Sequence, residues 1–557
     1  MRHLIIALLL STAPAAAATY DTVIAGGTIY DGTGGAPYAG WVALNGDRIA
    51  AIGKGQAPAA KTTVDATGKA VAPGFINMLS WSTESLFVDG RAQSDLRQGI
   101  TLEVMGEGFS MGPINEDMRA QIIKGQSDYK FPVKWTTLGE YLTTLEKLGI
   151  APNVASFVGA TTVRVHELGA GDVDPTPAQL EAMKKLVRVA MNEGAMGVGS
   201  SLIYAPAFFA ETPELIALAT ESAKCGGMYI SHIRNESDHV EQATAELIEI
   251  ARASGGPAEI YHMKQAGKAN WGKLDAIIKM VEDARAKGIR ITADMYTYTA
   301  GATGLDASMP LWVQAGGTEA WIARLKDPAT RAKVIADMKN PPAGEENLLK
   351  MAGSPDKVLL LGFANPKLKP LAGKTLAEVA KMRGTSPEET AIDLVIEDGT
   401  RVGTAYFLMD EANVRRQTGL PWMAFGSDAE AQAPEGPFLL SSTHPRAYGN
   451  FSRFLGKYVR DENTATLADA VRRLSGFPAE NLGIKDRGTL KAGNFADVVV
   501  FDPKTVIDHA TFEKPQVFAT GVNQVFVNGV QVLKDGEPTG KPAGRFVKGP
   551  GAGKCPV

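Results

Sequence analysis

The sequence predicts a (β/α)8 barrel of the α/β class, joined to a small β-sandwich domain. Three observations carry this prediction. The middle of the 557-residue chain alternates compact apolar runs with amphipathic, charged stretches, which is typical of repeated βα units around a parallel sheet. Both ends of the chain instead contain short strand-like runs with Asn-Gly turns. The 45% hydrophobic content is ample for a large buried core, and the length favours two domains.

The two strand-rich ends predict one β domain that is assembled from residues 20–72 and 485–540. An Asn-Gly pair at 45–46 lies between two alternating apolar runs, which is the strongest short hairpin signal. A second Asn-Gly pair, at 528–529, repeats this pattern near the other end. Residues 488–502 also read as half-buried strand.

Residues 73–484 are predicted to form the barrel. Eight parallel strands over this length favour a closed barrel, with an open doubly wound sheet as the alternative, and no Gly-rich phosphate motif follows the first strand. About 125 residues separate the seventh and eighth strands, more than one helix requires, which predicts an inserted subdomain at about 305–370 that closes over the barrel mouth. The eight candidate strands are residues 74–81, 100–107, 153–160, 195–204, 227–234, 258–264, 289–296 and 422–428.

The first 18 residues are typical of a cleaved secretory signal peptide. Arg2 precedes an apolar run at 4–10, and an Ala-rich stretch follows with A-x-A choices near 16–18. The apolar run is far shorter than the roughly 20 residues that a membrane span needs, although a permanent anchor remains the alternative. We therefore expect an exported, periplasmic protein that has no membrane partner after signal cleavage.

Composition also limits the partners. The chain has 57 basic and 61 acidic residues and a formal charge of −4, with no basic face or acidic tail that suggests nucleic acid. A small-molecule partner is expected, and the oligomeric state is left open. Only Cys225 and Cys555 are present, so no disulfide framework is expected. Cys555 lies in a Gly/Pro/Lys-rich segment, 541–557, that we expect to be a flexible tail.

Four polar side chains stand at the ends of candidate barrel strands. His232 and His262 end two consecutive strands, Asp428 ends the eighth, and Glu107 ends the second between two glycines. Because the carboxyl ends of barrel strands converge on the active site, the two imidazoles are expected to meet within metal-binding distance. Glu107 and Asp428 are expected at the same rim, with Asp428 as a candidate metal ligand or general base. The alternatives are hydrogen-bonded core histidines, a helix cap at Asp428 and an exposed turn at Glu107.

Several motifs follow one another in a specific order, and together they resemble the D-aminoacylase branch of the amidohydrolases, also called N-acyl-D-amino-acid deacylases. The resemblance covers residues 20 to about 540. The motifs are PGFIN at 73–77, GEGFS at 106–110, GAMGVGSSLIYAP at 194–206, SHIRNES at 231–237, YHMKQAGKANWG at 261–272, MYTYTAGATGL at 295–305, FGSD at 425–428, HPRAYG at 444–449 and LKAGNFADVVVFD at 490–502.

The resemblance implies one zinc ion per chain, held by His232, His262 and a third ligand. The family's third ligand is usually a Cys in a Gly-Asn-Cys-Gly-Phe-Ser turn, and Glu107 stands where that Cys would be. A carboxylate also binds zinc, although its harder oxygen weakens the selectivity for this metal. The family's His-x-His pair after the first strand is replaced by Leu79 and Trp81, which cannot ligate. This replacement implies a mononuclear site.

The resemblance also assigns roles in the reaction. Asp428 would take a proton from the attacking water and pass it to the departing amine. Arg446 in HPRAYG matches the family's arginine that grips the substrate α-carboxylate, a task that suits its planar donors. Tyr296 matches a second carboxylate contact. The family's Ser six residues later is Ala302 here, so the expected carboxylate pocket departs from the family pattern at this position.

Two further residues are candidates for the pocket: Lys264, on the same strand face as His262, and Tyr204, at the rim of the fourth strand. The expected function is metal-dependent hydrolysis of N-acyl-D-amino acids to a carboxylate and a D-amino acid. One alternative is a hydrolase of other amides, such as D-residue dipeptides or cyclic amides. The other is a non-catalytic binding protein on a decayed amidohydrolase scaffold.

Overall fold

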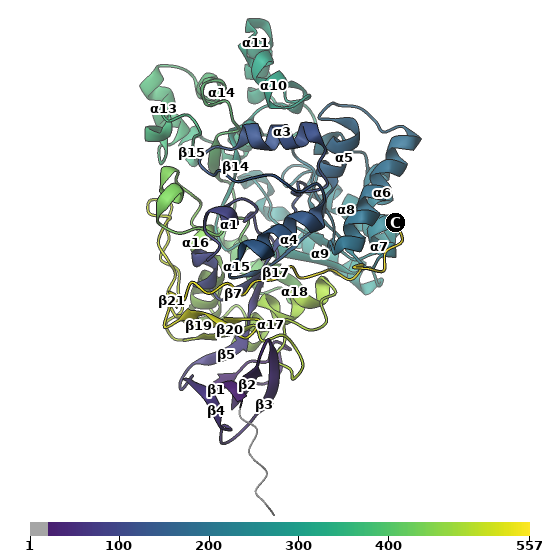
Figure 1. The fold of residues 1–557 in the computed structure, drawn as a ribbon. Coiled ribbons are helices and arrows are strands. Elements are labelled where there is room, and N and C mark those ends of the chain that lie inside the picture. The colour runs from purple at the N-terminus through teal and green to yellow at the C-terminus, as the bar shows by residue number, and fades with distance from the viewer. Residues whose placement is uncertain (1–19) are drawn as a thin grey trace, which may run out of the picture.

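The computed structural model describes residues 20–557 and contains the predicted barrel with a β domain at one end (Figure 1). The expected signal peptide, residues 1–18, lies outside the described residues. In Figure 1 the strands from both chain ends gather below the barrel, and the helices of the inserted subdomain rise above it. The barrel mouth therefore lies between the barrel body and the inserted subdomain.

The barrel has eight parallel strands, one at each predicted segment. Its first sheet pairs β6 (Phe75–Asn77), β7 (Ile100–Met105) and β8 (Asn153–Ser156). The strand resumes after Phe157 as β9 (Val158–Gly159), which begins the second sheet: β10 (Gly197–Ser201), β11 (Met228–His232), β12 (Ala258–Ile260), β13 (Ile291–Met295) and β17 (Met423–Phe425). The eighth strand returns to the first, because the Asp428 amide donates to the Leu79 carbonyl at 2.9 Å. The sheet is thus closed, as the sequence predicts.

Amphipathic helices surround this barrel, and their ends carry clear sequence signals. In α6, Thr176 and Gln179 form a capping box, Pro177 begins the helix and Gly194 follows its end. No helix within residues 20–557 is long and apolar enough to cross a membrane. The outer helices are α3 (Glu116–Gly125), α4 (Leu138–Leu148), α5 (Ala160–Leu168), α6 (Pro177–Glu193), α7 (Thr212–Lys224), α8 (Val240–Ser254), α9 (Leu274–Ala286), α15 (Glu411–Thr418), α16 (Arg446–Arg453), α17 (Leu467–Leu474) and α18 (Gly476–Asn481). Two short helices, α1 (Ser85–Val88) and α2 (Gln93–Leu96), follow the first strand.

The β domain joins the two ends of the chain in one nine-stranded arrangement. The central pairing is antiparallel, between β5 of the first segment and β18 of the last. Its separate core contains Ile24, Val42, Val498 and Phe526, so neither end completes the domain alone. The strands are β1 (Tyr20–Ile29), β2 (Tyr38–Asn45), β3 (Arg48–Gly53), β4 (Ala60–Asp65), β5 (Ala70–Pro73), β18 (Val498–Phe501), β19 (Val522–Val527), β20 (Val530–Lys534) and β21 (Glu537–Pro538).

The inserted subdomain is larger than the predicted 305–370. Its sheet places β16 (Gly403–Phe407) between β14 (Ala300–Gly304) and β15 (Val358–Gly362), both antiparallel to it. Residues up to Phe407 therefore belong to the same unit, which has its own apolar core. The prediction ended too early because the sequence pattern does not show which strand completes the sheet. The helices are α10 (Thr318–Lys326), α11 (Pro328–Lys339), α12 (Leu348–Ala352), α13 (Leu376–Arg383) and α14 (Pro387–Asp398).

Residues 541–557 do not form the free tail that their composition suggested. They run along the barrel, where the Val547 amide donates to the Val154 carbonyl at 2.9 Å (Figure 1). The glycines serve close packing: a Cβ at Gly544 would lie 1.8 Å from the Pro152 carbonyl oxygen. A disulfide between Cys225 and Cys555, 330 residues apart, fixes the end of this segment to the turn after α7.

Candidate metal centre and substrate pocket

One cavity of about 810 Å³ at the carboxyl ends of the barrel strands contains every side chain that the sequence nominates for the site. His232 is the last residue of β11, and Glu107 and His262 each lie two residues beyond their strands, β7 and β12. The barrel thus brings together side chains that are far apart in the sequence. The nominated residues that line the cavity are Glu107, Tyr204, His232, His262, Lys264, Tyr296, Asp428 and Arg446.

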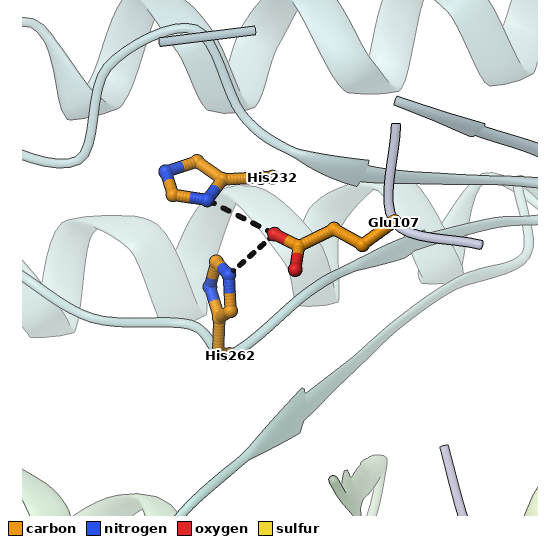
Figure 2. Close-up of side chains that lie close together, drawn as sticks. All are labelled: Glu107, His232 and His262. Carbon is orange, nitrogen blue, oxygen red and sulfur yellow. Dashed lines mark hydrogen bonds and ion pairs between the residues drawn. The ribbon is translucent and has the colours of Figure 1, made fainter. Parts of the chain in front are cut away.

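Glu107, His232 and His262 form a buried cluster of three potential metal ligands. Their donor atoms all lie within 4.8 Å of one another. Both imidazoles approach the same carboxylate oxygen: Glu107 Oε1 is 3.1 Å from His232 Nδ1 and 2.9 Å from His262 Nε2 (Figure 2). Two imidazoles and a carboxylate are a zinc donor set that leaves a position free for water or substrate. The residues present therefore fit a zinc ion.

The electrostatics of this cluster follow from burial and close pairing. Burial raises the pKa of the Glu107 carboxyl, but the charges and hydrogen bonds of His262 and His232 outweigh it and hold the pKa well below its usual value. Burial lowers the pKa of His232, whereas the carboxylates of Glu236 and Glu107 raise it, with a net result of about 9. The cluster is therefore an ion-paired group in which a bound metal ion would take the place of protons.

Glu236 is a buried carboxylate beside the cluster that the sequence analysis did not identify. Its Oε2 lies 3.3 Å from His232 Nε2, and its Oε1 lies 3.2 Å from His262 Nδ1 and 2.7 Å from Lys264 Nζ. These imidazole nitrogens are the ones that face away from Glu107. A carboxylate in this place orients ligating imidazoles and fixes their tautomers. Glu236 lies in the SHIRNES motif, but only the fold brings it against the second histidine.

An uncommon backbone conformation also sets the direction of the His262 and Asp428 side chains. His262 and Asp428 have positive φ angles of 35° and 49°, which are uncommon for residues other than glycine. The Asp294 carboxylate accepts a 2.7 Å hydrogen bond from the His262 backbone amide. The Leu79 carbonyl accepts a hydrogen bond from the Asp428 backbone amide. The surrounding barrel therefore holds both turns in place.

Asp428 lies between an indole and a guanidinium. Its Oδ1 accepts a hydrogen bond from Trp81 Nε1 at 3.0 Å, and its Oδ2 lies 2.8 Å from Arg446 Nη2. Burial raises the pKa of Asp428, and the charge of Arg446 opposes this effect without cancelling it. Trp81 Nε1 also lies 3.1 Å from Glu107 Oε2, so one N–H faces both carboxylates.

Arg446 presents free donors at a buried position. Its side chain is 3% exposed, and its Nε and Nη1 have no hydrogen-bond partner within residues 20–557. The Tyr296 ring lies 4.4 Å from the guanidinium carbon, and His444 Nδ1 accepts a 3.0 Å hydrogen bond from the Arg446 amide. Unpaired buried donors are costly, which points to an anionic ligand at this place. The carbonyl of Ala302, where the sequence resemblance implies Ser, accepts a hydrogen bond from Arg446 Nη2 at 3.3 Å.

The remaining two nominated residues line other parts of the cavity wall. Lys264 pairs with Glu236, and its ammonium also lies 2.7 Å from His262 Nδ1 and 5.5 Å from the Tyr296 ring centre. Tyr204 packs edge-on against His232, with ring centres 5.4 Å apart. Arg401 of the inserted subdomain lies 4.9 Å from the Tyr204 ring centre, so this subdomain supplies part of the wall.

Comparison with known proteins gives consistent matches over nearly the whole chain. A model of the amidohydrolase family matches residues 62–533. D-aminoacylase of Alcaligenes xylosoxydans xylosoxydans is 32% identical over 537 residues, which are 95% of this chain and 97% of that protein. A second match is the structure of N-acyl-D-glutamate deacylase from Bordetella bronchiseptica, solved with zinc and a phosphonate mimic of the tetrahedral intermediate. It is 30% identical, with a TM-score of 0.79, and the match covers 95% of this chain and 100% of that one. A D-aminoacylase structure with a binuclear centre, described by one-metal activation and second-metal attenuation, has a TM-score of 0.77, 30% identity and the same coverage.

Proposed function

Because this chain belongs to the amidohydrolase family and is a hydrolytic enzyme of that family, we propose that it cleaves the amide bond of N-acyl-D-amino acids. The products are a carboxylate and a free D-amino acid. One observation carries the proposal: the three-ligand cluster, Asp428 and the unpaired donors of Arg446 share a single cavity. The relatives named D-aminoacylase and N-acyl-D-glutamate deacylase support the substrate class.

Arg446 is the proposed anchor for the substrate α-carboxylate. Its Nε and Nη1 are free, and each carries N–H groups that can donate a charge-assisted hydrogen bond to a carboxylate. Tyr296, which lies over the guanidinium, closes the same side of the pocket. A substrate held there is fixed at one end, so its acyl amide is presented to the cluster at a set distance and orientation.

The cluster of Glu107, His232 and His262 would hold one zinc ion. Zinc in this site supplies Lewis-acid polarisation of the amide carbonyl and activation of water. The Glu236 carboxylate faces the outer nitrogens of both imidazoles, at 3.3 Å from His232 Nε2 and 3.2 Å from His262 Nδ1, and the buried setting excludes bulk water from these contacts.

Asp428 is the proposed general base and acid. Each carboxylate oxygen has two lone pairs, so Oδ1 can accept from Trp81 and still take the proton of the attacking water. The same oxygen then passes the proton to the amine nitrogen as the amide C–N bond breaks. Arg446 and the indole keep the carboxylate in place during both transfers.

The direct test is a panel of N-acetyl-D-amino acids, their L enantiomers and their carboxamide analogues, assayed with zinc-loaded protein. Release of the free D-amino acid, with little turnover of the L enantiomers and carboxamides, is the expected result. Equal turnover of carboxamides or cyclic amides would instead indicate a hydrolase of other amides. Absence of all turnover by a zinc-loaded, folded chain would indicate a binding protein.

We further propose that the enzyme acts outside the cytoplasm, most simply in the periplasm. The signal-like first 18 residues support export, and the Cys225–Cys555 disulfide suits an oxidising compartment. Mass spectrometry of the protein in a periplasmic extract should find a chain that begins near residue 19 with both cysteines oxidised. A full-length, reduced chain in the cytoplasmic fraction would contradict export.

A further inference from the structure

Trp81 lies where the first barrel strand meets the second and the eighth. Its backbone amide donates to the Ala429 carbonyl at 3.0 Å, and the neighbouring Ser80 amide donates to the Val104 carbonyl at 2.8 Å. The main chain at Ser80 and Trp81 is therefore tied to both adjacent strands. The indole ring lines the cavity between the metal cluster and the proposed base.

The indole N–H is shared by two carboxylates that each use their other oxygen elsewhere. Glu107 directs Oε1 to the two imidazoles and Oε2 to the indole, at 3.1 Å. Asp428 directs Oδ2 to Arg446 and Oδ1 to the indole, at 3.0 Å. The result is one continuous chain of polar contacts from the histidines to the substrate-binding arginine, with Trp81 at its centre.

We infer that Trp81 is a positioning residue, whose N–H sets the orientation of both Glu107 and Asp428. Each carboxylate rotates about its terminal bond, and a donor on the second oxygen removes this freedom. Two buried carboxylates also repel each other, and a shared N–H dipole offsets part of that repulsion. An indole N–H has no acceptor lone pair, so it performs this role without binding a metal ion.

The decisive variant keeps the shape of the indole and removes the donor. Incorporation of benzothienylalanine at position 81 replaces N–H with sulfur, and Trp81→Phe is the simpler companion. Trp312→Phe is the matched control, because Trp312 Nε1 donates to the Asp337 carboxylate at 2.8 Å outside the cavity. The zinc dissociation constant, measured by competition with a chelator, is the readout that does not depend on turnover.

The isosteric variant should bind zinc about 10- to 100-fold more weakly than the wild type, as expected for loss of a group that orients a ligand. It should also lower kcat by a similar factor with a smaller change in KM, because Arg446 remains. The Trp312→Phe control should retain the wild-type zinc affinity and the wild-type kcat. Wild-type zinc affinity and kcat in the isosteric variant would overturn the inference, and a defect in Trp81→Phe alone would assign Trp81 a packing role.

A spectroscopic measurement separates this inference from the proposed function, on which its kinetic arm rests. The indole ¹H–¹⁵N resonance of Trp81 can be assigned in metal-free protein by its absence from the Trp81→Phe variant. This resonance should move upfield in Glu107→Ala, and it should also move upfield in the separate variant Asp428→Ala. A resonance that moves in neither variant contradicts the shared contact. If the wild type hydrolyses no N-acyl-D-amino acid while the resonance moves in both, the proposed substrate is wrong and the positioning role stands.

Discussion

The indole nitrogen of Trp81 lies 3.0 Å from Oδ1 of Asp428. Trp81 stands where the sequence resemblance implies a metal-ligating histidine, and Asp428 is the proposed base. The contact joins the end of the first barrel strand to the proposed base at the end of the eighth. The contact is made by a neutral N–H donor, which cannot itself bind a metal ion.

Asp428→Asn should lower kcat by about 10²- to 10⁴-fold, the usual contribution of a general acid–base group. Zinc content should not change, because Asp428 lies outside the three-ligand cluster. Steady-state kinetics and elemental analysis of the same preparation check both parts. Asp508→Asn is the matched control, since Asp508 pairs with Arg453 at 3.2 Å and does not line the cavity. Loss of zinc in Asp428→Asn would make Asp428 a ligand.

Arg446→Gln should lower kcat/KM for N-acyl-D-amino acids by about 100-fold, because a charge-assisted pair to the substrate carboxylate is lost. The carboxamide analogue of the same substrate should be affected far less, apart from the loss of the contact to Asp428. The ratio of kcat/KM for the two compounds is the measurement. An unchanged ratio would exclude Arg446 as the carboxylate anchor.

The acid limb of the kcat/KM profile should lie above the ordinary Asp range near pH 4, because burial raises the pKa of Asp428. A base works only when ionised, so activity is lost as pH falls through this pKa. Arg446 opposes the shift, and Arg446→Gln should therefore move the limb to higher pH. Profiles of zinc-saturated enzymes check this. A limb that moves to lower pH in Arg446→Gln would contradict the assignment.

Removal of the disulfide should destabilise the fold without altering the reaction. In Cys225→Ser/Cys555→Ser, the loss of a bridge across 330 residues should cost about 2–4 kcal/mol. None of residues 541–557 lines the cavity, so kcat should remain at the wild-type value. Thermal unfolding with and without reductant tests this. A wild-type melting temperature that does not respond to reductant would argue against the pairing.

The sequence predicted the parts of the fold that depend on local pattern. Each barrel strand is a compact apolar run, and the ligands stand at strand ends, so topology alone predicts that His232 and His262 meet. The inserted subdomain was underestimated because the pairing of β16 with β14 spans about a hundred residues. The 541–557 segment was mispredicted because glycines that permit close packing look the same in sequence as glycines of a mobile tail.

Contacts between side chains from different strands could not be predicted from the sequence. Trp81 could be recognised as a lost ligand, but its hydrogen bonds to Glu107 and Asp428 depend on the closure of the first strand against the eighth. Glu236 was missed because its second partner, His262, lies on the next strand. Both residues are proposed to act through neighbouring side chains, and sequence periodicity carries no signal for such a role.

The zinc content of the purified mature chain tests the central claim most directly. Elemental analysis should find about one zinc per chain in the wild type, and Glu107→Ala should lose it while remaining folded by circular dichroism. Two zinc ions per chain would contradict the mononuclear site that Leu79 and Trp81 imply. No bound metal after reconstitution, or full retention in Glu107→Ala, would contradict the three-ligand cluster itself.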